Sequence, residues 1–292
     1  MSDAPSRPVY VVTDSTADIP PEMIGDRPLT VVPLIVEIAG QSYRDGIDLS
    51  RDQFLASLRE GHFPRTSQPS IGTFQEVYQE RIDRGYDIVS IHISSALSGT
   101  YNSAHAAAQA VAPERIRLID SHSVSITFGW IVLEAADLAA AGKSLDEVAA
   151  HAERRTGDQR LYAVLETLEY LHRGGRIGRS ALLLGSALQI KPIVQVRDGT
   201  VEPLERVRTM RRAIDRLVTL VTEQCPWDHA AVFHFVNPDA AEAVAARLRE
   251  AQPDINVITG QIGTVVATYG GPGLVGVGGL VRPRAVEGGD PA

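Results

Sequence analysis

The sequence predicts an α/β protein with two domains, an N-terminal parallel sheet with helices on both faces and a C-terminal mixed or antiparallel α+β domain. Apolar strands alternate with helix-like segments in the first half of the chain, which is typical of a parallel sheet. The second half contains hairpin signals, and the Asp198-Gly199 pair is the clearest of them. We therefore expect domains over residues 1–156 and 157–284, followed by a tail over 285–292.

The N-terminal elements follow from apolar runs and helix start signals. Ser50 and Gln53 form a capping-box pattern, which predicts a helix that begins after Ser50. A polar loop over Arg65–Ser70 leads into a second helix. Strands are expected at Val9–Thr13, Val31–Ile38, Asp87–Ile93 and Arg115–Ile119, and further helices at Tyr101–Ala108, 125–141 and 145–156.

The C-terminal elements are predicted in the same way. Pro238 is expected to open a helix that runs to Glu250, because proline is favoured in the first helical turn. A basic helix is expected after Arg208-Thr209. Strands are expected at Arg160–Leu165, Ile190–Val196, Ala230–Phe235, Ile255–Ile258 and Ile262–Thr268, and a further strand is expected to follow the Asp198-Gly199 turn and run to Val207.

Three hydroxyl-rich turns follow predicted strands of the N-terminal sheet: Asp14-Ser15, Ser94–Thr100 and Asp120–Ser123. Ligands of parallel sheets bind at the carboxyl ends of the strands, so we expect a polar pocket there. The second turn leads into a helix whose N-terminus favours an anion. We expect Ser98 to cap that helix and Gly99 to let a ligand approach the backbone.

The overall composition excludes several classes of protein. Hydrophobic residues make up 44% of the chain and charged residues 22%, which describes a soluble globular protein. The net charge of −8 argues against generic nucleic-acid binding, and we expect no nucleic-acid partner. The single cysteine, Cys225, suits a reducing compartment, and no apolar run resembles a signal peptide or a membrane span. We therefore expect a cytoplasmic protein.

Charge is distributed unevenly along the chain. The segment from Arg173 to Arg216 contains ten Lys/Arg and four Asp/Glu. This basic segment is either a solvated surface or a docking surface for a phosphate or an acidic partner.

Several apparent cofactor motifs fail on inspection. Gly271–Gly276 has the spacing of a dinucleotide fingerprint, but too few residues follow it for the acidic partner and the βαβ unit that such a site needs. Gly142-Lys143-Ser144 lacks the upstream glycine of a P-loop, since Asp137 stands there. The eight histidines show no metal-ligand spacing. We expect neither a metal nor a cofactor.

The chain resembles the DegV family, whose characterised members are similar to the fatty-acid-binding subunit of bacterial fatty acid kinase. The matching segments occur in the family's order and span nearly the whole chain. They are Thr13–Ala17, Thr66–Ser70, Ile93–Tyr101, Asp120-Ser121, Gly174–Gly178, Lys191–Ile193, Val207–Thr209 and Gly271–Gly273.

The resemblance implies a cytosolic, bacterial lipid-binding protein that holds a long-chain fatty acid between its two domains and has no catalytic activity of its own. The fatty acid's carboxylate would be held by Thr66 and Ser98, with Gly99 at the same turn. Further support would come from Asp14, Ser15, Ser94 and Ser95.

The resemblance also implies a partner, a separate cytosolic kinase subunit that makes the acyl phosphate from ATP. Arg176 and Arg208 would meet this kinase or the phosphate, and both lie in the basic segment. Tyr269 stands where the family commonly has a histidine, and its hydroxyl can donate a hydrogen bond but stays neutral near pH 7. Transient contact with a membrane is left open.

Two alternatives from other classes remain at this stage. Ser98 could be the nucleophile of a hydrolase, although no histidine is tied to it by sequence. The same helix N-terminus could instead bind a small phospho-ligand. If a fatty acid binds, candidates for its tail tunnel are Leu97, Phe128, Leu165 and the residues 182–184.

Overall fold

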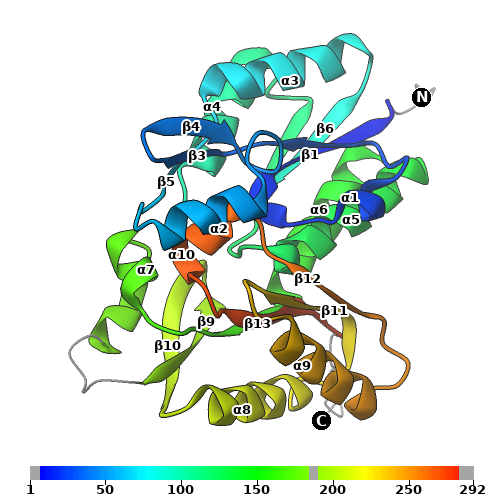
Figure 1. Ribbon diagram of the computed structural model, residues 1–292. Coiled ribbons are helices and arrows are strands. Elements are labelled where there is room, and N and C mark those ends of the chain that lie inside the picture. The colour runs from blue at the N-terminus through cyan, green and yellow to red at the C-terminus, as the bar shows by residue number, and fades with distance from the viewer. Residues whose placement is uncertain (1–6, 184–189, 283–292) are drawn as a thin grey trace, which may run out of the picture.

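The computed structural model describes residues 7–183 and 190–282, and these form three β-sheets flanked by helices (Figure 1). Sheets A and B lie in the upper part of the view and are built from the first half of the chain. Sheet C lies in the lower part and is built from the second half. The predicted mixed α/β fold class is confirmed.

Sheet A is the predicted parallel sheet. Its strands in spatial order are β2 (Leu29–Val32), β1 (Val9–Asp14), β6 (Asp87–His92) and β7 (Ile116–Asp120). The short helices η1 (Ser15–Ala17) and α1 (Pro21–Ile24) join β1 to β2. Helices cover both faces, as predicted. On β1, Val12 packs in the core cluster beside α3 (Ile71–Asp83) and α4 (Thr100–Val111), whereas Val11 packs beside α5 (Ile126–Ala140) and α6 (Leu145–Arg155).

Sheet B is a small antiparallel sheet that the sequence did not reveal. It consists of β4 (Gln41–Arg44), β3 (Ile35–Ile38) and β5 (Arg65–Ser67). The predicted strand Val31–Ile38 is therefore wrong, because the run divides near Pro33 between sheets A and B. Proline has no N–H to donate to a ladder, which favours a break there. Between β4 and β5, α2 (Arg51–Arg59) begins with the predicted capping box of Ser50 and Gln53.

Sheet C is mixed, as predicted. Its strands in spatial order are β10 (Thr200–Val207), β9 (Lys191–Arg197), β8 (Gln159–Val164), β13 (Val275–Val281), β11 (Trp227–His234) and β12 (Val257–Gln261), and only β11 and β12 pair in parallel. α8 (Met210–Thr222) and α9 (Pro238–Ala251) cover one face. The predicted hairpin joins β9 to β10, and Asp198 and Gly199 have the positive φ values of 47° and 77° that a tight hairpin turn needs.

Two predictions at the C-terminal end are wrong. Residues 262–268 do not form a strand, because β12 ends at Gln261 and helix α10 (Thr264–Gly270) follows. The central strand β13 was missed because its glycines are atypical of a strand. The helix α5 packs closely on β13, and a Cβ on Gly278 would lie 2.0 Å from Thr127 Oγ1. The glycines therefore allow this close approach.

The chain passes from sheets A and B to sheet C through η2 (Thr156–Asp158). The predicted boundary between residues 156 and 157 falls within this short helix. It stays a prediction, because α5 packs against strands of both sheet A and sheet C. The expected tail over 285–292 lies outside the described residues. The remaining helices of the second half are α7 (Glu169–Arg173) and η3 (Gly178–Leu183).

Candidate functional site

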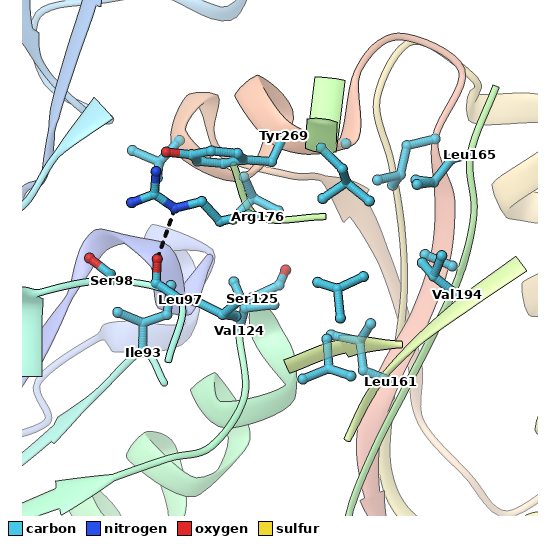
Figure 2. Close-up of a pocket in the computed structure, with 18 of the residues that line it drawn as sticks. Ile93, Leu97, Ser98, Val124, Ser125, Leu161, Leu165, Arg176, Val194 and Tyr269 are labelled. Atoms are coloured by element: carbon cyan, nitrogen blue, oxygen red, sulfur yellow. Dashed lines mark hydrogen bonds between the residues drawn. The ribbon is translucent and has the colours of Figure 1, made fainter. Parts of the chain in front are cut away.

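A mostly apolar cavity lies between the turns of the N-terminal half and the face of sheet C that α8 and α9 leave uncovered (Figure 2). It encloses about 810 Å³ of space outside atoms, its open mouth included. The strands β8 and β9, the helix α10 and the segment before α5 contribute to its wall. Apolar lining residues include Leu161, Ala163, Leu165, Val194, Phe233 and Leu274.

The polar side chains of the cavity are few, and several gather at one end. Figure 2 shows Ser98, Arg176 and Tyr269 at one end and Leu161, Leu165 and Val194 at the other. Thr66 belongs to the polar end, since its hydroxyl lies 2.5 Å from the Tyr269 hydroxyl. Among the lining residues that the structure describes, Arg176 is the only charged one. The arrangement fits an elongated apolar ligand with an anionic end.

Arg176 is held in place by backbone carbonyls and an aromatic ring. Its Nε donates to the carbonyl of Leu97 over 3.0 Å, and a terminal nitrogen donates to the carbonyl of Gly174 over 2.9 Å. The guanidinium carbon lies 5.1 Å from the centre of the Tyr269 ring, within the range of a cation–π contact. These contacts leave further N–H groups of Arg176 for a ligand. The sequence analysis assigned Arg176 to a different role from Thr66 and Ser98, whereas in the structure all three side chains line the same cavity.

Tyr269 reaches the cavity because α10 packs against α7 with little space between them. A Cβ built on Gly174 would lie 2.4 Å from the Tyr269 ring. Glycine at position 174 therefore leaves room for the ring. The Gly174–Gly178 segment, which the sequence analysis singled out by its resemblance to a family motif, thus shapes the polar end of the cavity.

Ser98 lines the cavity, but it is not the helix cap that the sequence predicted. The N-cap of α4 is Gly99, and the Ser98 hydroxyl accepts a bond of 3.3 Å from the N–H of Thr100. The helix begins at Thr100, one residue before the expected Tyr101, and because its N-cap is Gly99, Ser98 is a turn residue. A Cβ on Gly99 would meet the Gln68 side chain at 2.9 Å, so Gly99 lets the Thr66–Ser70 segment approach the Ser98 turn.

The four predicted supporting residues make contacts within the protein and do not line this cavity. The carboxylate of Asp14 accepts from the backbone of Thr16 and Ile93 and contacts His92 Nδ1 at 3.0 Å. These contacts fix the turn after β1. Ser15 Oγ accepts from Leu34 N, Ser94 Oγ donates to Gly199 O, and Ser95 N donates to Asp120.

The three hydroxyl-rich turns at the predicted sheet edge do not all face this cavity. Of the turns Asp14-Ser15, Ser94–Thr100 and Asp120–Ser123, only the second supplies a hydroxyl to this cavity, that of Ser98. The hydroxyl of Ser121 bonds within its own turn, whereas those of Ser15 and Ser94 bond to other segments of the chain. Their position at the carboxyl ends of strands was predicted correctly, but their direction depends on the turn conformation.

Ser125 is a cavity residue that the sequence analysis missed. Its backbone has a φ of 62°, and its hydroxyl donates to Asp18 Oδ2 over 2.5 Å. Asp18 Oδ1 accepts from the N–H of Gly263, which precedes α10. Burial, together with the nearby carboxylate of Asp45, raises the pKa of Asp18 to about 7. Asp18 thus ties the cavity wall to the start of the helix that carries Tyr269.

Only some of the residues predicted to line the tail tunnel line this cavity. Leu97 and Leu165 line the cavity. Phe128 is fully buried in the core and is not a lining residue. Residues 182–184 lie where the structure does not describe the side chains. Arg208 is exposed in the turn between β10 and α8 and does not line the cavity.

The surroundings of Ser98 do not resemble those of a nucleophilic serine. Its hydroxyl contacts Thr100 Oγ1 at 2.9 Å, and within the described residues it has no bond to a histidine or a carboxylate. A nucleophilic serine needs such a base within reach. Over residues 7–183 and 190–282, no cluster of His, Cys, Asp or Glu could hold a metal, and no helix could cross a bilayer.

Comparison with known proteins identifies the family. Residues 8–281 match the family model described as an uncharacterised protein of the DegV family. A DegV domain-containing protein of Streptomyces coelicolor is 39% identical over 277 residues, which cover 93% of this chain and 98% of the relative.

Two solved structures have the same fold. A DegV family protein from Thermus thermophilus, described by its fatty acid binding, gives a TM-score of 0.87 at 33% identity and covers 94% of this chain and 100% of its own. DegV of Bacillus subtilis, described as a fatty acid binding protein, gives 0.85 at 32% identity and covers 95% and 100%. The chain described here is therefore a member of the DegV family.

Proposed function

We propose that this protein binds a long-chain fatty acid in the cavity, with the carboxylate at the polar end. The observation that carries the proposal is the distribution of polar groups in the cavity. The described lining is mostly apolar, and the guanidinium of Arg176 lies at one end beside the hydroxyls of Thr66, Ser98 and Tyr269. The fatty acid binding described for the relatives from Thermus thermophilus and Bacillus subtilis supports the same assignment.

The two ends of the ligand would contribute differently to affinity. A palmitate tail has about 14 methylenes, and burying each contributes ~0.8 kcal/mol, so the gross contribution is roughly 11 kcal/mol. Each hydrogen bond to the carboxylate contributes about 1.5–3 kcal/mol. The tail therefore dominates affinity. The polar end fixes the orientation, because an unpaired buried carboxylate would be strongly unfavourable.

Arg176 belongs to the head-group site in this proposal. Its guanidinium offers a planar fork of donors that matches a carboxylate, and Leu97 and Gly174 already fix its direction. Thr66, Ser98 and Tyr269 would add hydroxyl donors. The backbone near Gly99 would contribute through the turn that holds Ser98.

We further propose that the protein presents its fatty acid to a separate kinase in the cytoplasm, as the non-catalytic subunit of a fatty acid kinase. Arg208 is exposed and lies outside the cavity, so it is suited to contact a partner or the transferred phosphate. Tyr269 would position the carboxylate through its hydroxyl, which can donate a hydrogen bond.

The two alternative functions fit the geometry less well. A hydrolase using Ser98 would need a base beside that hydroxyl, and its partner there is Thr100. A phospho-ligand would place a doubly charged group in a cavity whose described lining offers one cation, Arg176. The long apolar wall would also have no role in recognising a small phospho-ligand.

Mass spectrometry of lipid extracted from the purified protein tests the proposal. We expect a fatty acid in a near-stoichiometric amount, and native mass spectrometry should show the same mass on the intact protein. Apo protein that also fails to bind added palmitate and oleate would refute the assignment. Labelling of Ser98 by an active-serine probe would favour the hydrolase.

A further inference from the structure

A second cavity adjoins the apolar one at β8 and β9. Its lining is mainly polar and includes Gln159, Arg160, Gln195 and Arg197. Two apolar residues, Leu161 and Val196, line both cavities. The apolar cavity therefore ends, on this side, at a wall that has a polar cavity behind it.

Leu161 and Val196 form this wall because of the strand register. Tyr162 on β8 pairs with Gln195 on β9, so continuing the antiparallel ladder by one residue sets Leu161 opposite Val196. Their side chains project from the same face of sheet C and are cross-strand neighbours. Leu161 is buried, at 6% exposure.

The segment before α5 also separates the polar cavity from the apolar one. His122 and Ser123 line the polar cavity, whereas the next two residues, Val124 and Ser125, line the apolar one. In Figure 2, Leu161 lies at the end of the apolar cavity away from Ser98, Arg176 and Tyr269. A ligand anchored by its carboxylate at those three residues would point its methyl end toward the wall.

We propose that Leu161 and Val196 close the far end of the apolar cavity and so determine the longest acyl chain that fits entirely within it. The inference rests on the proposed binding of a fatty acid and goes beyond it by naming residues that determine chain-length specificity. Each methylene that reaches apolar surroundings raises affinity about fourfold. A methylene beyond the wall would enter the polar cavity and gain little.

The test is a binding series with the intact protein and saturated fatty acids from decanoate to arachidate. Delipidated wild-type protein should bind each acid about 16-fold more tightly than the acid two carbons shorter, until a limiting length beyond which affinity no longer rises. Leu161→Ala lengthens the cavity and should move that limit to a longer acid. Leu161→Phe shortens the cavity and should move it to a shorter one.

Ile93→Val is the matched control, since Ile93 lines only the apolar cavity and lies toward the Ser98 end of it in Figure 2. It should change affinity across the series while the limiting length stays the same. Val196→Phe tests the other side of the wall and should shorten the limit as Leu161→Phe does. It serves as the main variant if a Leu161 variant fails to show the wild-type circular dichroism spectrum.

Two failures can be distinguished. If the wild-type protein binds no acid of the series, the proposed function is wrong. If the wild-type protein binds, but folded Leu161→Phe and Val196→Phe proteins keep the wild-type limiting length, the wall does not set chain length and the inference is overturned.

Discussion

The hydroxyl of Tyr269 lies 2.5 Å from the hydroxyl of Thr66, although 203 positions separate the two residues in the sequence. Thr66 belongs to β5 of sheet B, and Tyr269 belongs to α10 in the second half of the chain. Both line the apolar cavity. The polar end of the cavity is therefore assembled by the docking of the two halves.

Tyr269→Phe tests this contact. If the Tyr269 hydroxyl binds the carboxylate, its removal should weaken fatty acid binding by about 1–3 kcal/mol, the cost of a lost hydrogen bond to a charged group. Titration with a fluorescent fatty acid measures the change. Tyr43→Phe is a control, because Tyr43 lies on β4 outside the cavity. Unchanged affinity in Tyr269→Phe would show that Tyr269 only packs against Arg176.

Arg176→Ala should weaken fatty acid binding about as much as Ser98→Ala or more. Within residues 7–183 and 190–282, the guanidinium is the only charge that lines the cavity, so its loss removes the one described cation near the carboxylate. We expect a loss of about 1.5–3 kcal/mol, which is roughly 10- to 150-fold in the dissociation constant. Near-wild-type affinity of Arg176→Ala in the same titration would contradict a head-group role for Arg176 and would favour a role in contacting the kinase.

Arg208→Ala should leave fatty acid affinity nearly unchanged and abolish acyl-phosphate formation with the cognate kinase. The reason is its exposed position outside the cavity, where it can meet a partner. ATP-dependent acyl-phosphate formation by fatty-acid-loaded protein is the measurement. Arg211→Ala, an exposed change on the neighbouring turn of α8, is the control and should remain active. Full activity of Arg208→Ala would remove Arg208 from the proposed partner surface.

Gly174→Ala should displace the Tyr269 ring, because the new Cβ would lie 2.4 Å from it. We expect a loss of stability of about 1–3 kcal/mol together with weaker fatty acid binding. Gly157→Ala is the matched control, since no atom lies within 4 Å of a Cβ built there. Thermal unfolding followed by circular dichroism compares the two variants. Equal melting temperatures would mean that the ring moves aside without cost.

Asp18 should make stability depend on pH near neutrality. Its pKa is about 7 in the folded protein against 3.8 for the free side chain, so folding binds a proton. The free energy of unfolding contributed by Asp18 is therefore greatest below pH 3.8 and falls as the pH rises to 7.

The comparison with Asp18→Asn isolates this effect, because asparagine does not titrate. The free energy of unfolding of wild type minus that of Asp18→Asn should decrease from pH 4 to pH 7.5. Urea unfolding at several pH values within this range measures it. A difference that stays constant with pH would show that Asp18 is ionised in the folded protein throughout.

The sequence by itself determined the elements that have strong local signals. The alternation of strands and helices predicted sheet A. The Ser50 capping box predicted the start of α2, and the Asp198-Gly199 pair predicted the hairpin between β9 and β10. These succeed because each pattern reflects the backbone geometry of a few neighbouring residues. Family motifs added Thr66, Ser98 and Arg176, which the structure brings to one cavity.

Only the tertiary structure decided which side chains meet. The strand β13 was missed because its glycines serve contacts with Thr127 and Phe233 from elements distant in sequence. Arg176 was separated from Ser98 for the same reason, since its bond to the carbonyl of Leu97 spans 79 positions. Local patterns fix backbone conformation within a few residues, whereas the direction of a side chain in a cavity depends on the packing of segments that no local pattern relates.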